Sequence, residues 1–130
     1  MKIHESAENY LETILVLNQR NGNVRAIDIA NELEFSKPSV SVAMKNLRNN
    51  GYIQVDDSGS ITLLPEGEKI ARAVYEKHTL LTRYLMSLGV PDEIAAEDAC
   101  RIEHVISKES FEALKAHAVN HGFVTIKEET

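Results

Sequence analysis

The sequence predicts a mainly α-helical protein with one small β-hairpin, arranged as a winged helix-turn-helix followed by an all-helical domain. Three observations predict this class. Apolar residues recur at helical spacing over most of the chain, two short segments alternate with period two, and aromatic residues make up only 5% of the composition. A 130-residue chain without Trp must build its core from Leu, Ile, Val and Ala, which favours helices.

The length and composition also limit the class of protein. At 130 residues the chain can hold two small domains, and we expect them at residues 1–64 and 65–130. One Cys excludes an internal disulfide, the first residues lack the apolar run of a signal peptide, and no stretch approaches membrane-spanning length. We therefore expect a soluble, cytoplasmic protein that has no membrane partner.

The first two helices are predicted at residues 5–19 and 25–33. In the first, Tyr10, Ile14 and Leu17 recur at i, i+4 and i+7, and the glycine of Asn21-Gly22-Asn23 ends the helix. In the second, the side chains expected to pack inward are Ile27, Ala30 and either Leu33 or Ile29. A tight turn is expected to follow at residues 34–37.

A third helix is predicted to start at Pro38, with Ser36 or Lys37 as its N-cap, and to end at Gly51. Its core face repeats at i, i+4 and i+7: Val40, Met44 and Leu47. Two short helices joined by a tight turn are typical of a helix-turn-helix, whose second helix enters the major groove of DNA. A structural helical pair that binds no DNA is the alternative.

The outward face of this third helix is basic, although the whole chain carries a net charge of −6. Residues 35–50 contain three Lys or Arg and no Asp or Glu. Ser39 and Ser41 can donate to phosphates, and Val42 can touch a thymine methyl group. We expect eight DNA-contacting residues: Ser36, Lys37, Pro38, Ser39, Ser41, Val42, Lys45 and Arg48.

A β-hairpin is predicted directly after this helix. Residues 52–55 and 60–63 alternate with period two, and Asp57-Ser58-Gly59 supplies turn residues between them. A hairpin in this place is a wing. Because its tip carries Asp56 and Asp57 where a phosphate contact requires Lys or Arg, we expect it to add little to DNA affinity.

Three helices are predicted in the second half of the chain. The first runs from Pro65 to about Leu88, with Ile70, Val74, Leu81, Leu85 and Leu88 as its apolar stripe. The second runs from Glu93 to about Ile106 with Asp92 as its cap, and the third covers residues 108–119 with Ser107 as its cap. Their apolar faces exceed what a monomer can bury, so we expect a homodimer.

Two histidine features and the tail have ordinary interpretations. His78 lies clear of the stripe of the long helix, and a lone helical His is usually structural or exposed. His117 and His121 indicate a fraying helix end rather than a metal site, since no third ligand is near. Residues 123–126 are expected to form a short edge strand or a mobile end.

A possible metal site lies near residue 100. Cys100, Glu103 and His104 lie at i, i+3 and i+4, so a thiolate, a carboxylate and an imidazole leave one helix face within a turn. These donors suit a transition metal. Each also has an ordinary alternative, as an inert Cys, a solvated Glu or a hydrogen-bonded His. The trio alone leaves both interpretations open.

The order of elements and five segments resemble the diphtheria toxin repressor family of metal-dependent transcriptional regulators. The segments are residues 8–14, 36–41, 63–67, 77–81 and 99–105, and the resemblance covers about residues 5–114. It implies a winged helix-turn-helix joined to a helical metal-binding and dimerisation domain. The short chain implies the two-domain form, without the SH3-like third domain of the long iron-type members.

The resemblance also implies six metal ligands, at Asn9, Glu12, His78, Cys100, Glu103 and His104. Cys100 is similar to the iron-responsive branch, Glu12 and His78 are similar to the manganese-responsive branch, and Asn9 matches neither. Because a thiolate is a soft donor and the carboxylates are hard donors, we expect iron(II) first and manganese(II) next. Cobalt(II), nickel(II) and zinc(II) are further candidates for binding in vitro.

The function implied is that of a metal-activated repressor controlling metal-ion homeostasis. A cation between the two domains acts as co-repressor, and a homodimer binds a palindromic operator in double-stranded DNA. The alternative is a winged-helix regulator that does not sense metal. A hydrolytic metalloenzyme is disfavoured, because no His-Glu-x-x-His or comparable pattern occurs; we expect neither catalytic residues nor a small organic substrate.

Overall fold

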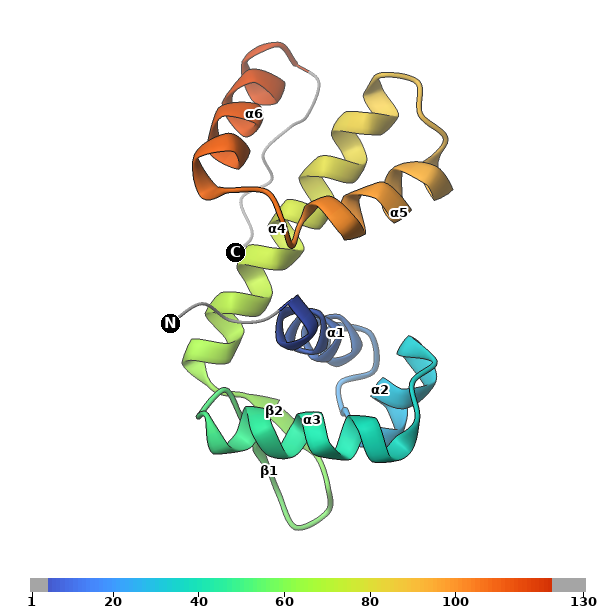
Figure 1. Cartoon of the computed structure of the whole chain (residues 1–130), viewed down its shortest axis with the longest axis vertical. Coiled ribbons are helices and arrows are strands. Elements are labelled where there is room, and N and C mark those ends of the chain that lie inside the picture. Colours follow the sequence, from blue (N-terminus) through green and yellow to red (C-terminus); the bar gives the residue numbers. More distant parts are fainter. Residues whose placement is uncertain (1–4, 123–130) are drawn as a thin grey trace. The chain divides into compact units, whose positions relative to one another are not determined.

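The computed structural model describes residues 5–122, which form six helices and two strands (Figure 1). The chain divides into two compact units after Ala73, which we call the first unit and the second unit. No helix among the described residues is both long and apolar enough to cross a membrane. The segment 123–126, predicted as a strand or a mobile end, lies outside the described residues.

The first unit holds three helices and a hairpin, in the order expected for a winged helix-turn-helix. Its elements are α1 (Glu5–Asn21), α2 (Ala26–Leu33), α3 (Lys37–Asn49), β1 (Ile53–Val55) and β2 (Ile61–Leu63). Each contributes a buried aliphatic side chain to the core: Ile14, Ile29, Val40, Ile53 and Ile61. The predicted winged helix-turn-helix is therefore confirmed.

The turn between α2 and α3 has the predicted cap. The Ser36 hydroxyl oxygen accepts the Ser39 backbone N–H at 3.3 Å, and Pro38 lies in the first helical turn, where its missing N–H costs nothing. Glu34 ends α2 in the left-handed region, with φ 57° and ψ 39°. The side chains predicted to face the core, Val40, Met44 and Leu47, are all buried.

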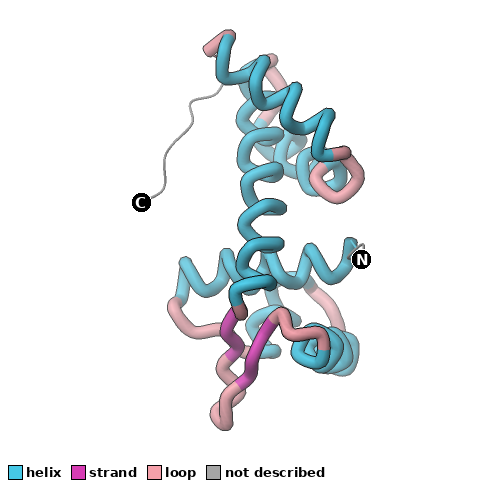
Figure 2. The backbone as a smooth tube through the Cα atoms, turned by 90° about the vertical axis from the view of Figure 1, so that its left-hand side faces the viewer, coloured by secondary structure: helices cyan, strands magenta, loops and turns pink. Residues whose placement is uncertain are grey.

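The hairpin is a short antiparallel pair, drawn in magenta in Figure 2. Gln54 pairs with Thr62 in the centre of the register. The Ile61 N–H donates to the Val24 carbonyl oxygen at 2.7 Å, and the Ser60 hydroxyl contacts the Asn23 side chain. The wing is thus attached to the loop between α1 and α2 as well as to α3.

Helix α4 (Pro65–Ser87) begins against the backbone that enters the hairpin. The Leu64 N–H donates to the Tyr52 carbonyl oxygen at 2.9 Å. A Cβ on Gly67 would collide with that oxygen and would lie 3.0 Å from the carbonyl carbon. The close approach of helix and backbone therefore requires glycine at this position.

The second unit consists of the later part of α4, α5 (Asp92–Ile102) and α6 (Lys108–Asn120). Its core contains Leu80, Phe111 and Ala118, with Tyr84, Ile106 and Leu114 packed around them. Each of these residues comes from α4, from α6 or from the turn before α6. The predicted all-helical second half is confirmed for the described residues, whereas the division predicted after residue 64 stays a prediction.

Helix α5 is shorter than predicted. It ends at Ile102 rather than near Ile106, and residues 103–106 form a turn. The turn is needed because Ser107 is the N-cap of α6, where its hydroxyl accepts the Ser110 N–H at 3.0 Å. At the other end, the N-cap is Pro91 rather than Asp92, whose carboxylate accepts the Glu93 N–H at 2.8 Å.

Two side chains predicted to pack inward are exposed. Ile27 is 40% exposed because the buried residues of α2 are Ile29 and Ala30, and a residue two positions away projects from the other side of a helix. Leu88 is 58% exposed because it follows Ser87, the last helical residue of α4.

Candidate metal centre and DNA-binding surface

Glu103 continues the buried face of α5, where an apolar residue would be expected. Ala95 and Ala99 are fully buried, and the next residue at this spacing is Glu103, which is 1% exposed. Its backbone keeps the helical conformation, with φ −58° and ψ −26°, and its N–H donates to the Ala99 carbonyl oxygen at 2.9 Å. A carboxylate is rarely buried in this way unless it is paired, so the position indicates a functional role.

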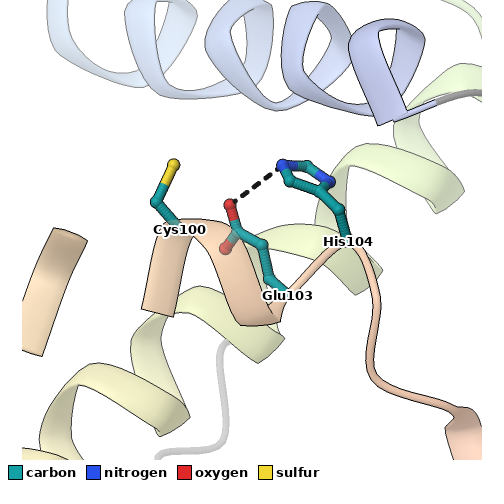
Figure 3. Close-up of side chains that lie close together, drawn as sticks. All are labelled: Cys100, Glu103 and His104. Carbon is teal, nitrogen blue, oxygen red and sulfur yellow. Dashed lines mark ion pairs between the residues drawn. The ribbon is translucent and has the colours of Figure 1, made fainter. Parts of the chain in front are cut away.

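Two imidazoles flank the Glu103 carboxylate. Oε2 lies 3.2 Å from Nδ1 of His78 on α4, and Oε1 lies 3.4 Å from Nε2 of His104. Figure 3 shows the second of these pairs. Both carboxylate oxygens are buried, and neither has a hydrogen-bond partner of ordinary geometry in the described part of the chain. Buried oxygens of this kind suit coordination to a cation.

Cys100 completes a cluster of three metal-ligating side chains. One ligand atom each from Cys100, Glu103 and His104 lies within 4.8 Å of the others, and Cys100 is exposed. The three side chains rise from the same side of the chain (Figure 3). In a tetrahedral site with bonds of about 2.0–2.3 Å, the ligand atoms lie about 3.3–3.8 Å from one another, so small side-chain movements would let the cluster hold a single divalent ion.

The two first-unit residues implied as ligands lie on one side of α1. Asn9 and Glu12 are three residues apart, and Glu12 is only 9% exposed although it is acidic. The backbone carbonyl oxygen of Asn9 accepts the Thr13 hydroxyl at 2.8 Å. This contact does not involve the Asn9 side chain, so the role of that side chain stays a prediction. Since these residues belong to the first unit, their joining the Cys100 cluster stays a prediction.

The histidine pair near the end of α6 lies where the sequence predicted. His121 is the C-cap residue, and its Nδ1 lies 2.9 Å from the His117 carbonyl oxygen. The two rings are 4.1 Å apart between centroids. No group of three ligating side chains includes them among the described residues, so they carry no argument for a metal site.

All eight residues predicted to contact DNA are exposed, on α3 or at its N-cap. The surface is basic, because Lys37, Lys45 and Arg48 lie on it and residues 35–50 contain no acid. The largest apolar side chain on it is Val42, which is 61% exposed. We call this set of eight residues the α3 surface.

The tip of the wing is acidic, and its first acid is engaged within the turn. Asp56 Oδ1 accepts the Ser58 hydroxyl at 2.7 Å and the backbone N–H groups of Ser58 and Ser60 at 2.9 Å. The Ser58 hydroxyl, followed by the Ser60 N–H, holds the pKa of Asp56 below its ordinary value. The carboxylate is therefore negatively charged wherever the protein meets DNA at neutral pH.

The residues alone did not predict that His78 meets Glu103. Spacing rules relate positions on one helix, and these side chains come from α4 and from the end of α5. The available signal was the acidic residue on the buried face of α5. A histidine on a neighbouring helix is an ordinary partner for such a carboxylate.

Comparison with known proteins identifies the family. Residues 2–60 match "Iron dependent repressor, N-terminal DNA binding domain", and residues 64–120 match "Iron dependent repressor, metal binding and dimerisation domain". The transcriptional regulator MntR of Salmonella typhimurium is 37% identical over 118 residues, covering 91% of this chain and 75% of the relative. The diphtheria toxin repressor of Corynebacterium glutamicum is 35% identical over 106 residues, covering 81% and 46%.

Solved structures agree with the sequence relatives. The manganese regulator SloR superposes with a TM-score of 0.77 at 26% identity, covering 97% of this chain. IdeR of T. acidophilum gives a TM-score of 0.75 at 25% identity, covering 95% of this chain. The chain spans 57% of the SloR chain and 56% of the IdeR chain. The chain belongs to the diphtheria toxin repressor family of metal-dependent transcriptional regulators.

Proposed function

We propose that this protein is a metal-activated, sequence-specific repressor that controls metal-ion homeostasis. The observation that carries the proposal is the buried Glu103 carboxylate, which lies between two imidazoles beside the Cys100 thiol. A buried carboxylate is costly unless a positive charge offsets it. A bound divalent cation would supply that charge and would accept the thiolate, carboxylate and imidazole donors.

The proposed ligands come from both units of the chain. They are the six residues implied by the family resemblance: Asn9, Glu12, His78, Cys100, Glu103 and His104. Asn9 and Glu12 lie in the first unit, and the other four lie in the second unit. Without a cation, the carboxylates of the two units would repel each other. We propose that a cation held by ligands of both units couples the two units and makes DNA binding depend on metal, so that the cation acts as co-repressor.

Iron(II) is the ion we propose, ahead of manganese(II). The thiolate of Cys100 is a soft donor, and Glu12 and Glu103 are hard donors; iron(II) accepts both kinds, whereas manganese(II) favours oxygen. The substitution Cys100→Glu should therefore shift the preference toward manganese(II). Isothermal titration of both proteins with each ion measures the preference, and an unchanged order of affinities would contradict the role given to Cys100.

The α3 surface is the proposed DNA contact. The substitutions Lys45→Ala and Arg48→Ala should each reduce the slope of log affinity against log salt by about 1, because each removes one phosphate contact. Lys108→Ala is the matched control, since Lys108 is an exposed lysine of α6 in the second unit. An unchanged slope in both α3 variants would assign DNA binding to another surface.

A homodimer formed through the second unit would present two α3 helices to DNA. Exposed apolar side chains of this unit are available for the contact: Met86, Leu88, Ile94 and Val105. Two recognition helices about 34 Å apart, or a whole number of DNA turns apart, read a palindromic operator. We propose that this regulator acts in the cytoplasm, where its operator lies, and that it has no enzymatic activity.

The decisive experiment compares chelator-stripped protein with protein loaded with iron(II) or manganese(II), using fluorescence anisotropy of duplexes selected from a random library. We expect loaded protein to bind about 5- to 150-fold more tightly. Glu103→Ala should abolish the difference, whereas Glu97→Ala, which changes an exposed acid of α5, should preserve it. Equal binding by stripped and loaded protein would leave a winged-helix regulator that does not sense metal.

A further inference from the structure

One large apolar side chain of α3 is presented to solvent rather than to the core. Val42 is 61% exposed, whereas Val40, Met44 and Leu47 are 0%, 6% and 4% exposed. Valine is also a weaker helix former than Ala, Lys or Glu, because its branched side chain loses rotamer freedom. Neither packing nor helix propensity therefore favours valine at this exposed position.

The surroundings of Val42 are those of a DNA-contacting face. Ser39 and Lys45 lie three residues before and after it, so all three share one side of α3, and all are exposed. The Ser36 hydroxyl donates to the Ser39 hydroxyl oxygen at 2.8 Å, which directs the Ser39 side chain toward the start of the helix. Val42 therefore lies in the middle of the α3 surface, between a hydroxyl and an ammonium group that suit phosphates.

The wing offers no comparable apolar contact. Its outward strand pair is Gln54 and Thr62, and its tip carries Asp56 and Asp57, all of them polar and exposed. A negative tip is repelled by the DNA backbone. Of these two elements, therefore, α3 rather than the wing can make an apolar contact with a base.

The DNA-binding function proposed above provides the setting for this inference. We propose that Val42 reads the C5-methyl group of a thymine in each half-site of the operator. Thymine is the only standard base that displays a methyl group in the major groove, and apolar side chains recognise it by contact. Because the side chain of a helical valine has one strongly preferred rotamer, its two methyl groups are held in place before DNA binds.

Deoxyuridine substitution tests the inference directly, because it removes the methyl group and keeps every hydrogen-bonding group of the base. An operator is first selected from a random duplex library with metal-loaded protein, and each thymine is then replaced singly by deoxyuridine. We expect about a fourfold loss of affinity at one thymine in each half-site, the value of one buried methyl group, and about 15-fold when both are replaced.

The variant Val42→Ala shortens the contacting side chain, so it should bind the thymine and deoxyuridine duplexes with nearly equal affinity. Ile27→Ala is the matched control, because Ile27 is an exposed β-branched residue of α2 that lies outside the α3 surface. It should retain the wild-type discrimination. Cytosine at the same position should bind more tightly once methylated at C5 in the wild type, and should gain nothing in Val42→Ala.

The outcomes separate this inference from the proposed function. Metal-dependent, sequence-specific binding that no deoxyuridine substitution weakens would overturn the role of Val42 and leave the repressor intact. Discrimination that survives in Val42→Ala would assign the methyl contact to another residue and would also overturn the inference. Selection that recovers no specific duplex would overturn the proposed function together with the inference.

Discussion

Replacing Cys100 with Ser tests the metal centre at its softest donor. Serine keeps the size of the side chain and removes the thiolate, and because Cys100 is exposed the change disturbs no buried packing. Four-ligand structural zinc sites bind with about 10–16 kcal/mol, so one ligand corresponds to about 3 kcal/mol, or about 100-fold in affinity. The metal concentration that gives half-maximal DNA binding should therefore rise about 100-fold, whereas the DNA affinity at saturating metal should stay unchanged.

The assay combines DNA binding with spectroscopy. Anisotropy of a labelled operator measures the metal midpoint, and cobalt(II) absorption in the near ultraviolet reports a thiolate-to-metal charge-transfer band that Cys100→Ser should lose. Arg101→Ala is the control, because this neighbouring side chain is 74% exposed and its ion pairs with Glu97 and Asp98 lie on the surface. A serine variant that keeps the band or the wild-type midpoint would refute the assignment of Cys100 as a ligand.

Three further predictions concern the fold and are checked by urea denaturation or by NMR. Gly67→Ala should lower the free energy of unfolding by about 1–3 kcal/mol, because its Cβ collides with the Tyr52 backbone; an unchanged midpoint would contradict this. Glu34→Gly should raise the free energy of unfolding by about 0.5–1 kcal/mol by relieving a left-handed backbone, and a loss would show that the strain is absent. Ser58→Ala should raise the pKa of Asp56 toward 3.8. Since the folded pKa lies below the unfolded value, the stability from Asp56 is present above the ordinary carboxyl range and is lost as the pH falls through the lowered pKa. An identical NMR titration of Asp56 in both proteins would contradict this.

Most of the first unit could be predicted because local signals mark its boundaries. Gly22 and Gly51 adopt positive φ values after α1 and α3, and Ser36 caps α3 as its sequence position indicates. The alternation of the hairpin strands also agrees with their burial, because Ile53 and Ile61 are buried and Gln54 and Thr62 are exposed. These features depend on residues close in sequence, so a pattern can reveal them.

The misplaced end of α5 has a different cause. No Gly or Pro follows Ile102, and the apolar Val105 and Ile106 extend the helical pattern by chance. The helix stops because Ser107 adopts an extended conformation to cap α6. In addition, Ile106 packs against the core formed by α4 and α6. Tertiary packing decided this boundary, and local propensity could not reveal it.

The candidate site was predictable only in part for the same reason. The spacing of Cys100, Glu103 and His104 on one chain segment is a local signal, and the structure brings their ligand atoms together. His78 approaches Glu103 from α4, and no spacing rule connects residues on different helices. The prediction that His78 is a ligand came from the family resemblance, as did the predictions for Asn9 and Glu12, which no contact within either unit tests.

The early end of α5 affects how the metal preference of such a regulator can change during evolution. Glu103 still donates its N–H to the Ala99 carbonyl oxygen, but no helical turn follows Glu103 and His104, so their backbone can adjust to cations of different radius more readily than the middle of a helix could. Discrimination between ions would then depend on donor chemistry, and Cys100 is the one soft donor of the proposed set. A substitution at Cys100 alone would then change the preferred metal without changing any helix.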